Sequence, residues 1–125
     1  MILDTNALSA AADGDAAVVA LLGRAEQMAI PVIVLGEYRY GMAQSRRRAS
    51  YETWLTSLLR DCQVLDVNEP TTQHYAEIVL ELKRVGKPIP TNDLWIAALC
   101  RQHSLPLISR DRHFDLVAGV KRIAW

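Results

Sequence analysis

The chain has 125 residues, half of them hydrophobic, and its 14 basic side chains balance its 14 acidic ones. This length predicts one domain that spans residues 1–125, and the balanced charge excludes a strongly basic protein that binds polyanions over its whole surface. No apolar run, including the one at residues 94–100, approaches the ~20 residues that a membrane span requires, so we expect no membrane association.

The cysteines and the N-terminus indicate the compartment. Cys62 and Cys100 are far apart and form no C-x-x-C pair, which argues against a zinc knuckle or a redox pair and favours reduced, packed thiols. The first residues lack the basic stretch and the apolar region of a secretory signal. We therefore expect a cytoplasmic protein.

The N-terminal half predicts strands and helices in alternation. Residues 1–3 form a short apolar strand that ends in a turn at Asp4. Apolar residues then recur at helical spacing over residues 18–25, and residues 30–35 are a β-branched run that predicts a buried strand. Glu37 opens a helix that we expect to reach about Arg48, and a second amphipathic helix follows over residues 51–59.

The C-terminal half continues this alternation. Residues 64–65 are a weak strand candidate, and residues 75–85 show the clearest helical spacing in the chain, ending near Gly86. Thr91 or Asn92 is expected to cap a helix that is apolar all round and therefore buried. Further strands are predicted at residues 105–108 and 123–124. This order predicts an α/β fold in which helices cover both faces of a parallel sheet.

Four acids stand where an apolar stretch meets a turn or a helix start: Asp4, Glu37, Asp93 and Asp111. Ligands of parallel sheets gather beyond the carboxyl ends of the strands, so these acids can converge there. Neighbouring carboxylates repel one another unless a cation lies between them. Because no histidine or cysteine has ligand spacing, the oxygen donors favour Mg²⁺ or Mn²⁺ over zinc, and such a site is typical of phosphodiester hydrolysis.

Each acid also has an ordinary structural interpretation. Asp4 can form a turn, Asp93 can favour a helix dipole, and Asp111 can cap a turn. Glu37 interrupts an apolar segment, where an unpaired carboxylate is costly unless a residue such as Arg39 neutralises it. The coincidence of four acids at equivalent edge positions favours a shared metal site.

Polar residues beside the acids are candidates for supporting roles. Four of them can orient ligands or water, although they are also ordinary turn formers: Thr5, Asn6, Asn92 and Ser109. Arg110 and Arg112 flank Asp111 and are expected to contact phosphate. Two groups are expected to be ordinary surface or packing residues: the run Arg46, Arg47 and Arg48, interpreted as a solvated helix end, and the isolated His74, His103 and His113.

The ordered motifs resemble those of PIN-domain ribonucleases, and more narrowly those of VapC toxins from VapBC toxin-antitoxin systems. The similarity spans the whole chain and rests on four segments: Leu3-Asp4-Thr5-Asn6, Gly36-Glu37-Tyr38-Arg39-Tyr40-Gly41, the stretch from Gly86 to Ala97, and Ser109-Arg110-Asp111-Arg112-His113-Phe114. The resemblance implies a three-layer α/β/α sandwich with a central parallel sheet. It also implies an endoribonuclease that depends on Mg²⁺ or Mn²⁺, a VapB-like antitoxin and a homodimer.

The family's catalytic, metal-binding acids fall on the same four residues, Asp4, Glu37, Asp93 and Asp111. Members of the family differ in how directly the acid at the position of Asp111 touches the metal, and Asp115 lies nearby. We therefore expect Asp111 to be a second or water-mediated ligand. Two alternatives to a ribonuclease stay open. One is a phosphatase with Asp4 as its covalent nucleophile, although the second Asp expected at position 6 is absent. The other is a metal-stabilised module that binds RNA or protein without catalysis.

Overall fold

A computed structural model describes all residues from Met1 to Trp125. Its centre is a five-stranded parallel sheet with the order β3-β2-β1-β4-β5. The strands are β1 (Ile2–Leu3), β2 (Met28–Pro31), β3 (Cys62–Leu65), β4 (Leu107–Ile108) and β5 (Arg122–Ile123). The predicted α/β class and parallel sheet are confirmed.

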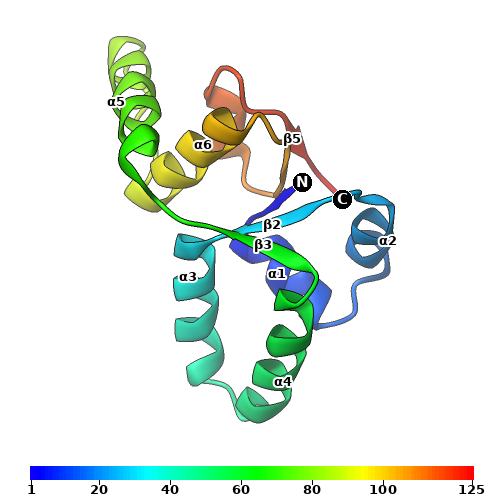
Figure 1. Ribbon diagram of the computed structural model, residues 1–125. Coiled ribbons are helices and arrows are strands. Elements are labelled where there is room, and N and C mark those ends of the chain that lie inside the picture. The colour runs from blue at the N-terminus through cyan, green and yellow to red at the C-terminus, as the bar shows by residue number, and fades with distance from the viewer.

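Helices cover both faces of the sheet. The chain folds α1 (Thr5–Ala12), α2 (Ala16–Arg24), α3 (Val32–Ala43), α4 (Arg48–Leu59), α5 (Glu69–Arg84) and α6 (Thr91–His103), and a short 3-10 helix, η1 (Arg112–Leu116), precedes β5. Figure 1 shows α1, α3 and α4 on one side of the sheet and α5 and α6 on the other. The fold is therefore a three-layer α/β/α sandwich. No helix has both the length and the apolar character needed to cross a bilayer.

The sheet order makes β1 the central strand. From β1 the chain adds β2 and β3 on one side and then β4 and β5 on the other, so the switch point lies between β1 and β4. Ile2 is in register with Ala29 of β2 and with Leu107 of β4. In parallel sheets, the crevice beside such a switch point is where ligands bind. The residues that leave β1 and β4, at Asp4 and Ser109, therefore occupy the most favoured position for a site.

Helix α6 is the buried helix that its composition predicts. Its buried residues are Leu94, Ile96, Ala97, Ala98, Leu99 and Cys100. Both cysteines are free, as expected. Helix α6 begins after Pro90 without a side-chain cap, so the prediction that Thr91 or Asn92 caps it is wrong; both lie inside its first turn.

The β-branched run at residues 30–35 was predicted as a strand, and this is wrong beyond Pro31. Strand β2 ends there, and α3 begins at Val32. Val34 and Leu35 are buried on the inner face of α3, whereas Val32 is 41% exposed. A short apolar run fits one face of a buried helix as well as it fits a buried strand, and the tertiary packing decides between them.

Two further boundaries differ from the predictions. The chain enters α1 directly at Thr5, where a turn was expected, because Asp4 caps that helix. Helix α3 ends at Ala43, so the arginines at 46–48 do not lie at its end; Arg48 is the first residue of α4. They are exposed, and the Arg47 guanidinium lies 5.0 Å from the centre of the Tyr51 ring. A helix C-terminal dipole therefore does not explain this basic run.

Helix α5 begins six residues before the predicted stripe because of a hydrogen-bonded cap. Asn68 Oδ1 accepts from the Thr71 backbone N at 3.4 Å, the Thr71 hydroxyl at 2.9 Å and Gln102 Nε2 at 3.0 Å. The Thr71 side chain is fully buried, and its single hydroxyl hydrogen can point to Asn68 Oδ1 or to Gln102 Oε1. This cluster joins the start of α5 to the end of α6.

Replacing Asn68 with alanine should destabilise the fold by about 1–2 kcal/mol, because it removes the cap and leaves donors without an acceptor. Urea unfolding monitored by circular dichroism measures the change. Asn68→Asp keeps an acceptor oxygen and should stay close to the wild type. Equal loss in both variants would contradict the importance of this acceptor.

Candidate active site

Asp4 leaves β1 and is held by hydrogen bonds on both carboxylate oxygens. Oδ1 accepts from the Thr5 backbone N at 2.8 Å, while Oδ2 accepts from Ser109 Oγ at 2.6 Å and from Asn6 Nδ2 at 3.1 Å. The residue is only 5% exposed. Its carboxylate is thus fixed at the switch point, between the ends of β1 and β4.

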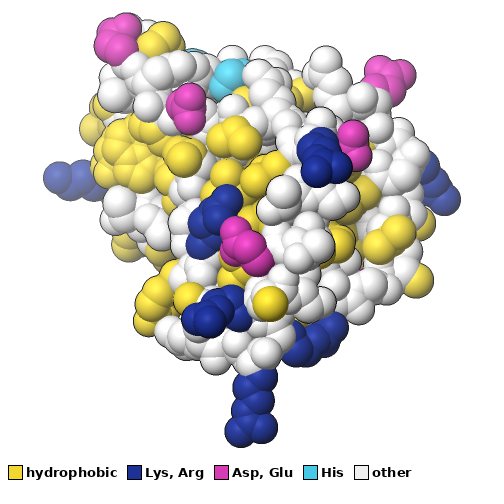
Figure 2. Space-filling model, turned by 60° about the horizontal axis from the view of Figure 1, so that its bottom comes forward, with side chains coloured by type: hydrophobic (Ala, Val, Ile, Leu, Met, Phe, Trp, Pro, Cys, Tyr) yellow, Lys and Arg dark blue, Asp and Glu magenta, His cyan; other side chains and the backbone are white.

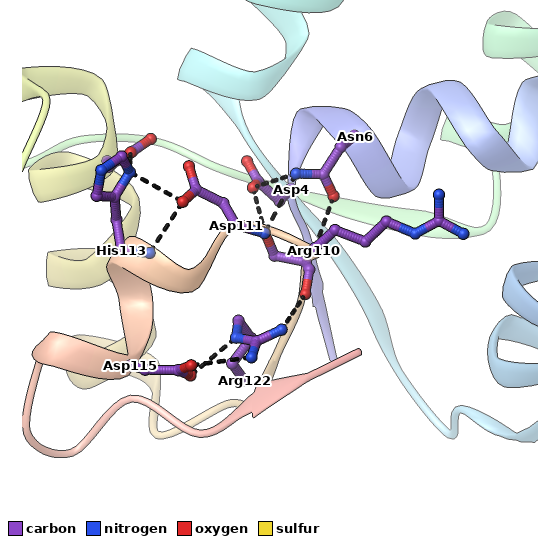
Figure 3. Close-up of polar contacts among 9 residues, drawn as sticks. Asp4, Asn6, Arg110, Asp111, His113, Asp115 and Arg122 are labelled. Carbon is purple, nitrogen blue, oxygen red and sulfur yellow. Dashed lines mark hydrogen bonds and ion pairs between the residues drawn. The ribbon is translucent and has the colours of Figure 1, made fainter. Parts of the chain in front are cut away.

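Ser109 and Asn6 connect the two strand ends to each other. Ser109 is fully buried, and its hydroxyl accepts from the Asp111 backbone N at 2.9 Å and from Asn6 Nδ2 at 3.2 Å. Asn6 Oδ1 accepts from the Arg110 backbone N at 3.1 Å. Figure 3 shows Asn6 and Asp4 facing the Arg110–Asp111 segment. The turn after β4 is therefore held in place by residues from the start of α1.

Glu37 reaches the same edge from α3. It lies in the second turn of this helix and not at the helix start that the sequence predicts. The Thr5 hydroxyl donates to Glu37 Oε1 at 2.9 Å. Since Thr5 also donates its backbone N–H to Asp4, this one residue links the Glu37 and Asp4 carboxylates.

Asp93 and Asp111 complete the group of acids, and His113 joins them. Asp93 lies in the first turn of α6, and Asp111 caps η1 by accepting from the His113 backbone N at 2.9 Å. The His113 ring atom Nδ1 is 2.9 Å from Asp111 Oδ1 and 3.6 Å from Asp93 Oδ2. The expectations of an ordinary histidine at 113 and of a site without histidine are therefore wrong.

Burial and mutual repulsion make this group of carboxylates unfavourable when all are ionised. Burial raises the pKa of Asp93 to about 7, repulsion from Asp111, Asp4 and Glu37 contributes, and His113 opposes the shift. Burial also raises the pKa of Asp4, and the hydrogen bonds from Ser109 and Thr5 oppose that rise. The chain's own donors thus do not neutralise the group.

The donor set fits a divalent cation. Carboxylates from four separate segments interact electrostatically at one edge, and no lysine or arginine forms an ion pair with Asp4, Glu37, Asp93 or Asp111. Asp93, Asp111 and His113 each offer one ligand atom, and these atoms all lie within 4.8 Å of one another. A cation bound here would relieve the repulsion that raises the pKa of Asp93.

The remaining predicted site residues lie differently. Asn92 is exposed and makes no hydrogen bond to the acids. The Arg110 side chain extends away from Asp111 in Figure 3; its guanidinium lies 4.4 Å from the centre of the Trp125 ring and 3.8 Å from Asp15. Arg112 is exposed. The structure therefore does not direct Arg110 toward the acids.

Asp115 is excluded as a substitute for Asp111. Both of its carboxylate oxygens accept from the Arg122 guanidinium, at 2.8 and 2.9 Å. Arg122 also donates to the Ser109 carbonyl at 3.1 Å. Figure 3 shows this pair on the other side of the turn from Asp4. Asp115 therefore holds the turn after β4 in place and is not free to bind a metal.

A cleft of about 300 Å³ adjoins Glu37 between α1, α3 and α4. Its lining residues are Thr5, Ser9, Ala12, Asp13, Glu37, Tyr38, Gly41, Met42, Ser45 and Tyr51. The Tyr38 hydroxyl is buried without a hydrogen-bond partner. At the end of the molecule formed by α3 and α4, Figure 2 shows Lys and Arg side chains around hydrophobic patches. Of the four acids, Glu37 thus borders a partly apolar cleft, with basic side chains near the α3–α4 turn.

This combination defines a class: a parallel α/β domain with a cluster of acids, suited to a divalent cation, at the switch point of its sheet. A family model for the PIN domain matches residues 1–120. The chain is 30% identical to Ribonuclease VapC5 of Mycobacterium tuberculosis over 125 residues, which cover 98% of this chain and 90% of the relative. The chain therefore belongs to the PIN-domain family and, within it, to the VapC group.

Solved structures agree with this assignment. The crystal structure of VapBC2 from Rickettsia felis bound to a promoter DNA fragment superposes with a TM-score of 0.87 at 26% identity, covering 99% of this chain and 97% of that one. FitAcB from Neisseria gonorrhoeae superposes with a TM-score of 0.81 at 29% identity, covering 98% and 95%. The resemblance seen in the sequence motifs is confirmed.

The raised pKa of Asp93 predicts how stability changes with pH when no divalent metal is present. An unfolded Asp93 loses its proton near its ordinary pKa of 3.8, whereas the folded chain holds the proton to about pH 7. Between these values the folded state binds more protons, so the free energy of unfolding decreases as the pH rises and levels off above about pH 7. We expect the urea midpoint in a chelator to fall between about pH 4 and about pH 7. Asp93→Asn should reduce that fall, and an equal fall in both proteins would contradict the assignment.

Proposed function

We propose that this protein is a metal-dependent endoribonuclease toxin, active in the cytoplasm and neutralised by a VapB-like antitoxin. Residues 1–125 would form its single PIN-like domain, and two copies would form a homodimer. The observation that carries the proposal is the convergence of Asp4, Glu37, Asp93 and Asp111 beside the switch point of the sheet. The names of the relatives, Ribonuclease VapC5 among them, support RNA as the substrate.

The proposed cofactor is Mg²⁺, with Mn²⁺ as a substitute, held by Asp4, Glu37, Asp93 and Asp111. When bound, such an ion lowers the pKa of an attacking water and neutralises charge on the phosphate oxygens. The chain's own residues keep the ligands in place. Ser109 and Asn6 fix the Asp4 carboxylate, and the Thr5 hydroxyl fixes Glu37. We propose catalytic roles for the four acids and supporting roles for these three residues.

The geometry disfavours Asp4 as a covalent nucleophile. Both of its oxygens accept hydrogen bonds, and the residue is almost completely buried. A nucleophilic carboxylate needs one oxygen free to reach phosphorus in line with the leaving group. The phosphatase alternative therefore has less support than hydrolysis by water.

Replacing Asp93 with asparagine should lower RNA cleavage by more than about 100-fold, because loss of even an indirect partner of a metal ligand costs 10–100-fold. Labelled RNA is incubated with the purified protein in Mg²⁺, in Mn²⁺ or in a chelator, and products are resolved on a gel. Asp61→Asn is the matched control, because Asp61 is exposed just before β3, at the opposite end of the sheet strands from the acids.

Full metal-dependent cleavage by Asp93→Asn would contradict the proposal. RNA binding by the wild type without any product would favour the non-catalytic module. A phosphorylated Asp4 would favour the phosphatase.

The cleft beside Glu37 is the surface that we propose for the antitoxin. Its partly apolar lining, with Tyr38 and Met42 buried, suits a segment of a partner protein, and it opens onto Thr5 and Glu37. The solved structure of VapBC2 from Rickettsia felis, which superposes with a TM-score of 0.87, supports a VapB-like partner for this chain. An antitoxin segment in this cleft would lie against the acids and block RNA.

Filling the cleft should separate antitoxin binding from catalysis. A side chain at Gly41 meets no atom within 4 Å, and Gly41 lines the cleft in α3. Gly41→Leu should weaken binding of a co-purified antitoxin by about tenfold or more, which is 1.4 kcal/mol, while RNA cleavage is retained. Gly36→Leu is the control, because Gly36 is equally open on the same helix and lies outside the cleft. Affinity is measured by calorimetry, and equal affinities in both variants would place the antitoxin elsewhere.

A further inference from the structure

His113 is the one residue of the acid group that the proposed function does not use. It lies in η1, two residues after Asp111, and its side chain is 49% exposed. Burial therefore does not force its ring toward the acids. Figure 3 nevertheless shows the ring facing the Asp111 carboxylate.

The distances around His113 match those between ligands of a single ion. Ligands about 2.1 Å from an ion lie about 3.0 Å apart when adjacent in octahedral geometry and about 3.4 Å apart in tetrahedral geometry. Nδ1 of His113 is 2.9 Å from Asp111 Oδ1 and 3.6 Å from Asp93 Oδ2. These two distances are close to those between ligands of one cation, and one ligand atom from each of the three residues lies within 4.8 Å of the other two.

The two carboxylates also leave ligand positions open. The Asp93 side chain is only 14% exposed, yet it accepts no hydrogen bond, and its nearest cationic group is the His113 ring. On Asp111, the hydrogen bond from the His113 backbone N and the contact with its ring both reach Oδ1, and Oδ2 accepts no hydrogen bond. A largely buried carboxylate without a hydrogen bond is costly unless it binds a cation.

A nitrogen ligand changes which cation the site prefers. Mg²⁺ takes oxygen ligands and keeps much of its hydration shell, whereas imidazole nitrogen is a good ligand for first-row transition metals. We propose that Asp93, Asp111 and His113 form a mixed nitrogen and oxygen site that selects a transition-metal dication such as Mn²⁺ over Mg²⁺. This inference rests on the proposed metal dependence and goes beyond it, because it adds a ligand that the acids do not supply.

The competing explanation is that His113 serves only as a charged partner of Asp111. Asparagine distinguishes the two roles. Its side-chain N–H can still donate to Asp111, but its amide nitrogen does not bind a metal. His103→Asn is the matched control, because His103 is in the last turn of α6, ten residues from Asp93 and thus about 15 Å away along the helix.

The test is pulsed electron paramagnetic resonance of Mn²⁺ added to the full chain, which detects coupling to a ligand nitrogen. We expect nitrogen coupling in the wild type and in His103→Asn and none in His113→Asn. Absence of the coupling in the wild type, or its persistence in His113→Asn, overturns the proposal. The wild-type spectrum decides the question even if a variant folds poorly.

Titration calorimetry supplies a second readout. Affinity for Mn²⁺ should fall by about 10-fold or more in His113→Asn, while affinity for Mg²⁺ changes little. An unchanged ratio of the two affinities overturns the proposed selectivity. RNA cleavage in Mg²⁺ by the wild type and by His103→Asn tests the nuclease proposal separately, so a failure of the His113 proposal remains distinguishable from a failure of the nuclease proposal.

Discussion

The arrangement of the site depends on the hydrogen bonds that hold the Asp4 carboxylate between the ends of β1 and β4. Ser109 donates to it from the end of β4, and Asn6 donates to it from α1 while accepting from the turn that carries Asp111. Strands β1 and β4 are neighbours in the sheet but are separated by about a hundred residues in the chain. The same bonds therefore position the first acid and orient the turn that carries the last.

This positioning is energetically unfavourable without a cation. The acids repel one another, and burial adds to the cost, as the raised pKa values of Asp93 and Asp4 indicate. A rigid arrangement of like charges stabilises a bound cation more than a flexible one does, because no reorganisation is needed on binding. The same arrangement of carboxylates thus causes their mutual repulsion and favours the binding of a cation.

The sequence alone predicts the parallel sheet and the buried helix α6. It also predicts that Asp4, Asp93 and Asp111 lie at the ends of strands or the starts of helices. These features follow from apolar periodicity and turn chemistry, which are local. Glu37 was identified as an unusual acid, but its local structure was mispredicted, because an apolar run of six residues does not distinguish a strand from a buried helix face. The extent of α3 was decided by its packing against α1.

The contacts around His113 could not be predicted from sequence. Its ring faces Asp111 because Asp111 caps the short 3-10 helix η1, and the hydrogen bond from the His113 backbone N holds His113 close to the Asp111 carboxylate. The D-x-H spacing is compatible with this geometry, but it is equally compatible with a ring in solvent. Similarly, the position of Arg110 next to Asp111 predicts a phosphate contact at the site. Its guanidinium instead lies over the ring of Trp125, the last residue of the sequence. Side-chain directions of this kind depend on long-range packing.

The two helices that carry Glu37 and Asp93 both start directly after a proline, Pro31 and Pro90, and neither has a side-chain cap. Because a proline disfavours helical backbone at the residue before it, neither helix can extend backward past its proline. A helix turns by about 100° per residue, so one residue inserted between Pro90 and Asp93 would rotate the carboxylate off the edge of the sheet. The number of residues from proline to acid is consequently under tighter geometric constraint than the identity of the residues between them.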